Sequence, residues 1–142
     1  MFIGEYSHNI DEKGRMAVPV KFRKEIGKAV VTKGLDGCLV IYPAAEWKKL
    51  ADKLSALPIS KANARGFSRL MLAGAMDISV DKQGRVMLPE YLRKFADISK
   101  KVIVAGLYNR VEIWNEAKWE KYRVGVEKDS SEIAEQLDDL AV

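Results

Sequence analysis

The feature that most constrains the fold of this 142-residue chain is an internal repeat. A shift of 70 places residues 4–24 over residues 74–94 with seven identities in 21 positions. A shift of 72 then aligns residues 34–50 with residues 106–122, with six identities in 17 positions. Unrelated segments of average composition would share about one position in sixteen. The chain therefore carries two copies of one unit, and its fold must accommodate both.

Each unit has the pattern of two β-hairpins separated by a short helix. The first hairpin turns at Asp-x-x-Gly, where aspartate favours the start of a type I turn and glycine supplies a left-handed residue. A proline after the return strand opens the helix, because it has no N–H to lose there. The predicted elements of the first unit are strands at 5–10 and 15–18, a helix at 20–26, and a hairpin of 29–33 with 38–42. Those of the second unit are strands at 75–80 and 85–88, a helix at 90–96, and a hairpin of 102–105 with 110–114.

Apolar residues at three- and four-residue spacing predict further helices between and after these units. The first follows Pro43 and stops before Pro58, and Ser60 is expected to cap the next, which runs to about Ala73. Asn115 is expected to cap a helix in the second unit, and the last residues favour a terminal amphipathic helix. We divide the chain into a first repeat at 5–48, a helical connector at 49–73, a second repeat at 74–122, and an acidic C-terminal tail or helix at 123–142.

The net charge of +4 conceals an uneven distribution along the chain. Residues 127–142 contain six acidic residues and one lysine, so the rest of the chain has nine more basic than acidic residues. A basic body with an acidic tail favours a polyanionic partner such as nucleic acid, with the tail solvating or masking the basic surface.

Composition also argues against several classes of protein. The longest apolar run, residues 38–45, is far shorter than the roughly 20 residues of a membrane span, and the N-terminus lacks the pattern of a secretory signal. The single cysteine, Cys38, excludes an internal disulfide, and with one histidine, His8, a metal site is not expected. Glycine-rich phosphate motifs are absent, and Ser7, His8 and Asp11 on one strand cannot form a catalytic relay. We therefore expect an intracellular, soluble protein that needs no metal or cofactor and is not an enzyme.

The arginine that directly follows each Asp-x-x-Gly turn, Arg15 or Arg85, is the strongest functional candidate. Turn geometry accounts for the aspartate and the glycine, but not for an arginine at the same place twice. In one interpretation the arginine pairs with an aspartate, for instance between the units, and stabilises the core. In the other, the hairpin displays a rigid guanidinium suited to phosphate or guanine. Both hold together if the aspartate orients the arginine.

Further basic residues surround these arginines in each hairpin and short helix. A two-stranded β-ribbon fits the major groove of DNA, and neighbouring basic residues can hold phosphates, although any single lysine could equally belong to a solvated surface. The candidate DNA-binding residues are Lys13, Arg15, Lys21, Arg23, Lys24, Arg85, Arg93 and Lys94. The motif residues with a structural role are Asp11, Gly14, Asp81 and Gly84. Lys13 and Lys21 correspond to Gln83 and Tyr91, so the first unit has the more basic hairpin.

The two Asp-x-x-x-Arg motifs, Asp11 to Arg15 and Asp81 to Arg85, resemble the MraZ family, as do the opening residues 1–4 and the spacing of about 70 residues. The resemblance runs nearly end to end, with only the tail after about residue 126 variable. It implies an α+β fold in which two pseudo-symmetric swapped-hairpin units of the SpoVT/AbrB type form one β-barrel-like core with flanking helices.

The resemblance also implies a function. Members of this family are bacterial transcriptional regulators associated with the nucleoid, and they bind short direct repeats upstream of the division and cell-wall gene cluster that includes their own gene. They assemble into rings of several subunits. For this chain the resemblance implies a cytoplasmic, nucleoid-associated homo-oligomer that binds double-stranded promoter DNA as a repressor, with no membrane and no small-molecule substrate.

A second hypothesis is a ring-forming scaffold for protein partners, in which both Asp-x-x-x-Arg motifs are only structural. An Arg15→Ala variant that keeps the oligomer but loses DNA would distinguish the two hypotheses.

Overall fold

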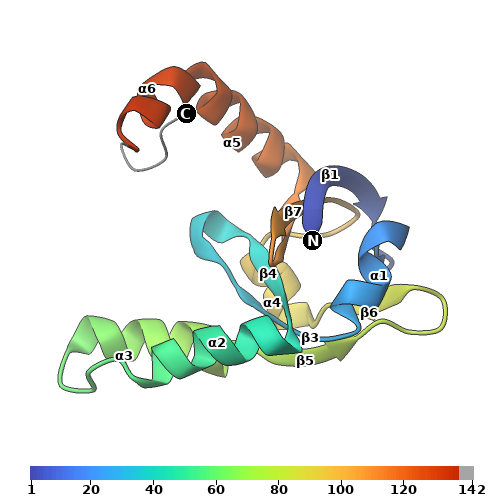
Figure 1. Ribbon diagram of the computed structural model, residues 1–142. Helices are drawn as coiled ribbons and strands as arrows, with labels where there is room; N and C mark the ends of the chain where they lie inside the picture. The colour runs from blue at the N-terminus through green and yellow to red at the C-terminus, as the bar shows by residue number, and fades with distance from the viewer. Residues whose placement is uncertain (138–142) are drawn as a thin grey trace.

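The computed structural model describes residues 1–137 and confirms the mixed α+β class (Figure 1). The strands are β1 (Phe2–Asn9), β2 (Arg15–Ala17), β3 (Lys28–Lys33), β4 (Leu39–Pro43), β5 (Met76–Ser79), β6 (Arg85–Met87), β7 (Lys101–Tyr108) and β8 (Val111–Asn115). The α-helices are α1 (Val20–Ile26), α2 (Ala44–Ser55), α3 (Ala62–Ser68), α4 (Glu90–Phe95), α5 (Glu116–Lys128) and α6 (Ser130–Glu135). A 3-10 turn, η1 (Leu35–Gly37), and a π-helical segment, η2 (Arg69–Ala73), complete the described elements.

Six strands form one antiparallel sheet in the order β1-β7-β8-β4-β3-β5. From either end the order has the same pattern with the repeats exchanged, because β1 corresponds to β5, β7 to β3, and β8 to β4. The two central strands are centred on Val40 opposite Glu112, and a separate two-stranded sheet, β2–β6, is centred on Met16 opposite Val86. Each pair joins residues related by the repeat. A pseudo-twofold axis therefore relates the two halves.

The first strand of each repeat pairs with the other repeat. β1 lies along β7, from Phe2 opposite Tyr108 to Asn9 opposite Lys101, and β5 lies along β3. The predicted first hairpin of each unit is therefore wrong beyond its turn. In the first unit, β1 and β2 are joined by an isolated bridge between Ile10 and Met16 and then separate, and in the second, β5 pairs with β3 while β6 pairs with β2. Separation lets both strands bury side chains in the shared core. The predicted second hairpins, β3–β4 and β7–β8, are confirmed.

The six-stranded sheet is open. Its edges are β1 and β5, so the expected barrel-like closure is wrong for the strands within residues 1–137. The short β2–β6 sheet contacts β1 and β5 instead and covers the core on that side. We call this two-stranded sheet the ribbon.

One hydrophobic core joins the two repeats. Met16 and Val86, from the two strands of the ribbon, are both only 1% exposed and belong to the same cluster as the central sheet strands. Phe22 of α1 meets the rings of Phe2 and Tyr6 edge to face, with centroids 5.2 and 5.4 Å apart. Both repeats contribute side chains to this cluster from the six-stranded sheet, from the ribbon and from a short helix, so neither repeat can form the core alone.

A smaller cluster lies apart from this core and is covered by α5. Cys38 is fully buried there, beside Val40, Ile103 and Trp114. The Trp119 ring of α5 packs edge to face on Trp114, with centroids 5.4 Å apart.

The connector forms an arm in which α2 and α3 lie side by side and project from the sheet (Figure 1). α2 ends at Ser55, before Pro58, as predicted. The expected cap at Ser60 is wrong, because α3 starts at Ala62 and its N-cap, Lys61, makes no side-chain capping bond. The helical path then continues through the π-helical segment η2 to Ala73.

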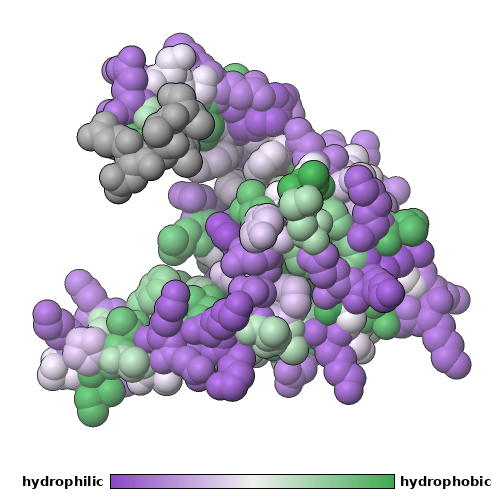
Figure 2. Space-filling view, viewed as in Figure 1, coloured by the Kyte–Doolittle hydropathy of each residue, from purple (hydrophilic) through white to green (hydrophobic). Residues whose placement is uncertain are grey.

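The C-terminal helices match most of the sequence prediction. Asn115 caps α5 and accepts a hydrogen bond from the backbone N–H of Lys118 at 3.0 Å. α6 falls where a terminal helix is predicted, and the predicted apolar position Leu140 lies outside the described residues. Through residue 137, no helix combines the length and apolar character needed to cross a membrane. Figure 2 shows hydrophilic side chains over much of the face that includes α5.

Candidate nucleic-acid interface

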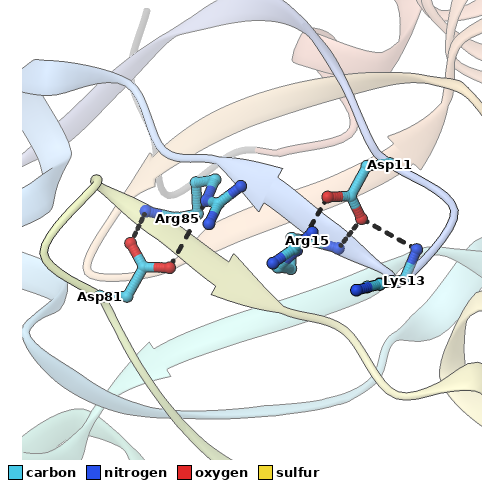
Figure 3. A network of polar contacts seen from close by, with 5 residues as sticks. All are labelled: Asp11, Lys13, Arg15, Asp81 and Arg85. Atoms are coloured by element: carbon cyan, nitrogen blue, oxygen red, sulfur yellow. Dashed lines mark hydrogen bonds and ion pairs between the residues drawn. The ribbon is translucent and has the colours of Figure 1, made fainter.

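The ribbon presents both motif arginines on one face. In its register Arg15 lies opposite Met87 and Ala17 lies opposite Arg85. Residues directly opposite one another in antiparallel strands share a face, and alternate residues along a strand do the same. The central pair, Met16 and Val86, faces the core, so Arg15 and Arg85 lie diagonally across the outer face (Figure 3).

The Asp-x-x-Gly turns have the predicted geometry. Asp11 Oδ1 accepts hydrogen bonds from the backbone N–H groups of Lys13 and Arg15 at 3.0 and 2.9 Å. Gly14 has φ +86° and donates its N–H to the Asp11 carbonyl at 3.0 Å. The second turn repeats this arrangement, with Asp81 Oδ1 accepting from the backbone N–H groups of Gln83 and Arg85. Both turns are therefore held rigidly by their own aspartates.

Each motif arginine forms an ion pair with the aspartate of its own turn and, among residues 1–137, with no acidic residue of the other unit. Arg15 Nε lies 2.8 Å from Asp11 Oδ2, and Arg85 Nε lies 3.5 Å from Asp81 Oδ2 (Figure 3). Within residues 1–137, the terminal guanidinium nitrogens of Arg15 and Arg85 donate to no protein atom. Asp11 thus orients Arg15 through a hydrogen bond, whereas Asp81 holds Arg85 by charge alone, and the terminal nitrogens of both arginines stay available for a ligand.

The pKa of the Asp11 carboxyl is lowered, above all by the hydrogen bond from the backbone N–H of Arg15; burial opposes this shift, and the Arg15 side chain adds to it. The pKa of Asp81 is lowered in the same way, first by the backbone N–H of Arg85. Both carboxylates therefore stay ionised under ordinary conditions, and the ion pairs persist.

The second pair of repeated arginines has a structural role across the repeats. Arg23 Nε donates to the Val18 carbonyl at 2.9 Å, and Arg93 Nε donates to the Leu88 carbonyl at 2.9 Å. The Arg23 guanidinium lies where a Cβ on Gly84 would stand, with its Cζ 2.4 Å from that point. These contacts explain why the arginines recur, and any DNA contact by Arg23 or Arg93 stays a prediction.

The predicted lysines lie around the ribbon on several elements. Lys13 is exposed in the first turn, and Lys21 and Lys24 are exposed on α1. Lys94 is exposed on α4, where its Nζ lies 3.2 Å from Glu90. Two further lysines that the sequence analysis did not select, Lys100 and Lys101, lie beside the first turn because β7 pairs with β1. In the sequence they lie 86 and 87 residues after the end of that turn, so only knowledge of the strand pairing could have placed them there.

The structure does not bring together catalytic groups in the part of the chain that it describes. Ser7 Oγ donates to Glu116 at 3.2 Å, whereas the Asp11 carboxylate is engaged by its own turn. The pKa of His8 is lowered by burial and by the charge of Arg23. Burial raises the pKa of the Cys38 thiol to about 12, so the thiol stays protonated. Residues 1–137 contain no group of three or more His, Cys, Asp or Glu placed to hold a metal ion.

Comparison with known proteins agrees with the repeat and the geometry of its turns. A family model described as "MraZ protein, putative antitoxin-like" matches twice, over residues 1–70 and 71–140. The chain is 48% identical over its full length, and over the full length of the relative, to the transcriptional regulator MraZ of Halothermothrix orenii. The identity is 50%, again over 100% of both chains, for the protein of the same name from Thermoanaerobacter sp. (strain X514). With two matches that together span nearly the whole chain, this protein belongs to the MraZ family.

Proposed function

We propose that this protein is a transcriptional regulator that binds double-stranded DNA through the outer face of the ribbon, with Arg15 and Arg85 in the major groove. The observation that carries the proposal is the pair of half-buried arginines on the outer face of the ribbon, each in an ion pair with the aspartate of its own turn. The name of the relatives, transcriptional regulator, supports the same reading and describes a class of protein other than an enzyme.

The dimensions and chemistry of the ribbon suit DNA. The major groove is about 12 Å wide and admits a two-stranded β-ribbon. An arginine whose terminal nitrogens are free can donate two hydrogen bonds to O6 and N7 of guanine, or to two oxygens of a phosphate. Lys13, Lys21 and Lys24 are exposed on the neighbouring turn and helix, where they can approach phosphates. We expect the first repeat, with its more basic turn, to contribute more of the affinity.

A single ribbon of this size offers few contacts, so we expect tight binding to require several copies. A ring-shaped homo-oligomer would place one ribbon on each short direct repeat of a promoter. After the first contact, each later one becomes intramolecular and multiplies the affinity. Occupation of the promoter by such a ring would exclude RNA polymerase, which makes the protein a repressor of the division and cell-wall gene cluster that includes its own gene.

Fluorescence anisotropy with DNA from upstream of the protein's own gene tests this proposal. Fragments with one, two and three direct repeats are compared with a scrambled fragment at two salt concentrations. We expect affinity to rise steeply with the number of repeats and to fall steeply with salt. A one-repeat fragment that binds as tightly as a three-repeat fragment would contradict the ring mechanism.

The Arg15→Ala variant separates DNA binding from the scaffold hypothesis. A variant that keeps the oligomeric mass of the wild type in light scattering but loses specific DNA supports regulation through the ribbon. A wild-type protein that oligomerises yet binds promoter and scrambled DNA equally, or binds neither, would instead favour a scaffold for protein partners.

A further inference from the structure

A hollow whose lining includes four basic residues lies beside the first turn, and the DNA contacts proposed for the ribbon do not use it. It has a volume of about 580 Å³, opens to solvent, and is lined by Asn9, Ile10, Asp11, Glu12, Lys13, Arg15, Lys100 and Lys101. Four basic side chains therefore face two acidic ones, and Asp11 is already paired with Arg15. We call this hollow the basic hollow.

Strand pairing fixes the two sides of the basic hollow relative to each other. Ile10 donates its backbone N–H to the Lys100 carbonyl at 2.9 Å, and Asn9 lies opposite Lys101 in the β1–β7 register. Asp11 then holds the turn through the N–H groups of Lys13 and Arg15. The backbone that carries all four basic side chains is thus rigid before any ligand arrives.

The lysines of the basic hollow have no anionic partner in the described part of the chain. Within residues 1–137, Lys13, Lys100 and Lys101 form no ion pair within 4 Å, whereas several other lysines do. All three are exposed. Like charges gathered in a concave surface raise the local potential and favour an anion there. Glu12 is the one opposing charge without a partner, and it is exposed on the turn.

The second turn lacks this arrangement. Val80 donates its N–H to the Gly27 carbonyl, and Lys28 lies opposite Ser79, so the counterparts of Lys100 and Lys101 are Gly27 and Lys28. A glycine therefore replaces one lysine. Lys82 takes the place of Glu12, and Gln83 takes the place of Lys13, so the second turn has three basic residues and one acidic residue where the first has four and two.

We propose that the basic hollow binds a phosphate of the DNA backbone, held by Lys100 and Lys101 with Lys13, next to the base pair that Arg15 contacts. The proposal rests on the proposed function, since it extends the DNA interface of the ribbon to the start of β7. It assigns Lys100 and Lys101 a role in affinity without sequence preference.

The test compares Lys100→Ala/Lys101→Ala with Lys121→Ala/Lys128→Ala, which removes the same charge from exposed positions of α5 beyond its first turn. Anisotropy is measured with promoter and scrambled DNA over a range of salt concentrations. We expect the first variant to lose about tenfold in affinity for both DNAs at low salt, and its log–log salt slope to shrink by about one. The α5 variant should retain both values. Thermal unfolding and light scattering check that fold and oligomer are unchanged, as expected for exposed side chains.

Equal losses in the two double variants, or none in either, would overturn the proposal. Saturable NMR shifts at Lys100 and Lys101 with inorganic phosphate below 1 mM would also overturn it, because they would assign the basic hollow to a free anion. The proposed function fails separately, if wild-type protein shows no preference for promoter DNA. Promoter preference that is lost in Arg15→Ala but kept at full affinity in Lys100→Ala/Lys101→Ala would leave the function standing and refute the phosphate site alone.

Discussion

At the scale of single residues, the two Asp-x-x-Gly glycines serve the contact between repeats as well as their own turns. A Cβ on Gly14 would lie 2.6 Å from the Leu88 carbonyl oxygen and 2.8 Å from Arg93 Nε. Gly84 meets Arg23 in the same way. The left-handed backbone alone would favour glycine, but the close approach of the other repeat requires it.

We therefore expect Gly14→Ala to destabilise the protein by about 2 kcal/mol or more, since strain in the backbone adds to a clash with backbone atoms. Gly37→Ala is a matched control, because Gly37 has φ +78° but no atom within 4 Å of its Cβ position. That variant should lose only the backbone part, about 1 kcal/mol. Urea denaturation measures both, and equal losses would contradict the packing role of Gly14.

The lowered pKa values of Asp11 and Asp81 predict sensitivity to acid. Because the folded pKa lies below the unfolded value of about 3.9, each carboxylate stabilises the fold fully above that value. The contribution is lost as the pH falls through the lowered folded pKa. The melting temperature of the wild type should thus decrease as the pH is lowered below about 4. The melting temperature of Asp11→Asn/Asp81→Asn should decrease less steeply over the same range. Parallel profiles would show that these carboxylates do not govern the acid transition.

At the scale of elements, the π-helical segment η2 depends on one buried side chain. Thr32 is fully buried in β3, and its hydroxyl donates to the Met71 carbonyl at 2.7 Å. A π-helical segment disrupts the regular hydrogen bonding of a helix, so carbonyls there need other donors. Thr32 thereby joins the helical arm to the six-stranded sheet.

Thr32→Val keeps the shape of the side chain but removes this donor. We expect a loss of about 1 to 3 kcal/mol in stability, because the Met71 carbonyl then stays buried without a partner. Thr32→Ser, which retains the hydroxyl and loses a methyl group, should lose less. Chemical denaturation with amide hydrogen exchange at residues 69–73 measures the effect, and a smaller loss for valine than for serine would contradict it.

Local elements could be predicted from the sequence, whereas their partners could not. The turns, the helix that starts at Glu116, and both second hairpins depend on neighbouring residues, and the structure confirms them. The partner of β1 depends on a register set more than 90 residues away, and a swapped strand satisfies the same alternating pattern as a hairpin. Lys100 and Lys101 were missed for this reason. Arg15 and Arg85 could be selected without knowledge of strand pairing, because they occupy equivalent positions in the two repeats.

The sequence alignment of the repeats departs from their structural alignment near the second hairpins, because the loops of these hairpins differ in length. Gly34 and Gly106 match in sequence, but the β3–β4 loop follows Lys33 and the β7–β8 loop follows Gly106. The second loop is therefore one residue shorter. A Cβ on Gly106 would lie 2.6 Å from the Ile3 nitrogen, whereas one on Gly34 would meet Cys38. The two identical residues serve different contacts.

At the scale of the whole molecule, the exchange of strands makes the halves interdependent. Residues 1–70 contain β1 and β2, whose partners β7 and β6 belong to the other half. We expect this fragment to be unfolded as a monomer and to fold when mixed with residues 71–142. NMR spectra of each fragment and of the mixture measure this, and a folded monomer of residues 1–70 would contradict the shared core.

The central claim is that Arg15 and Arg85 act together on one DNA-binding face, and replacing both tests it most directly. Arg15→Ala, Arg85→Ala and the double variant are compared with Lys121→Ala for binding to promoter and scrambled DNA, with oligomeric mass and melting temperature measured alongside. We predict that Arg85→Ala weakens promoter binding about tenfold, as expected for a lost bidentate contact, and that Arg15→Ala, in the more basic repeat, weakens it further and loses most of the preference for promoter DNA. The double variant should bind promoter and scrambled DNA equally while keeping its oligomeric mass. A double variant that retains the wild-type preference for promoter DNA would contradict the account.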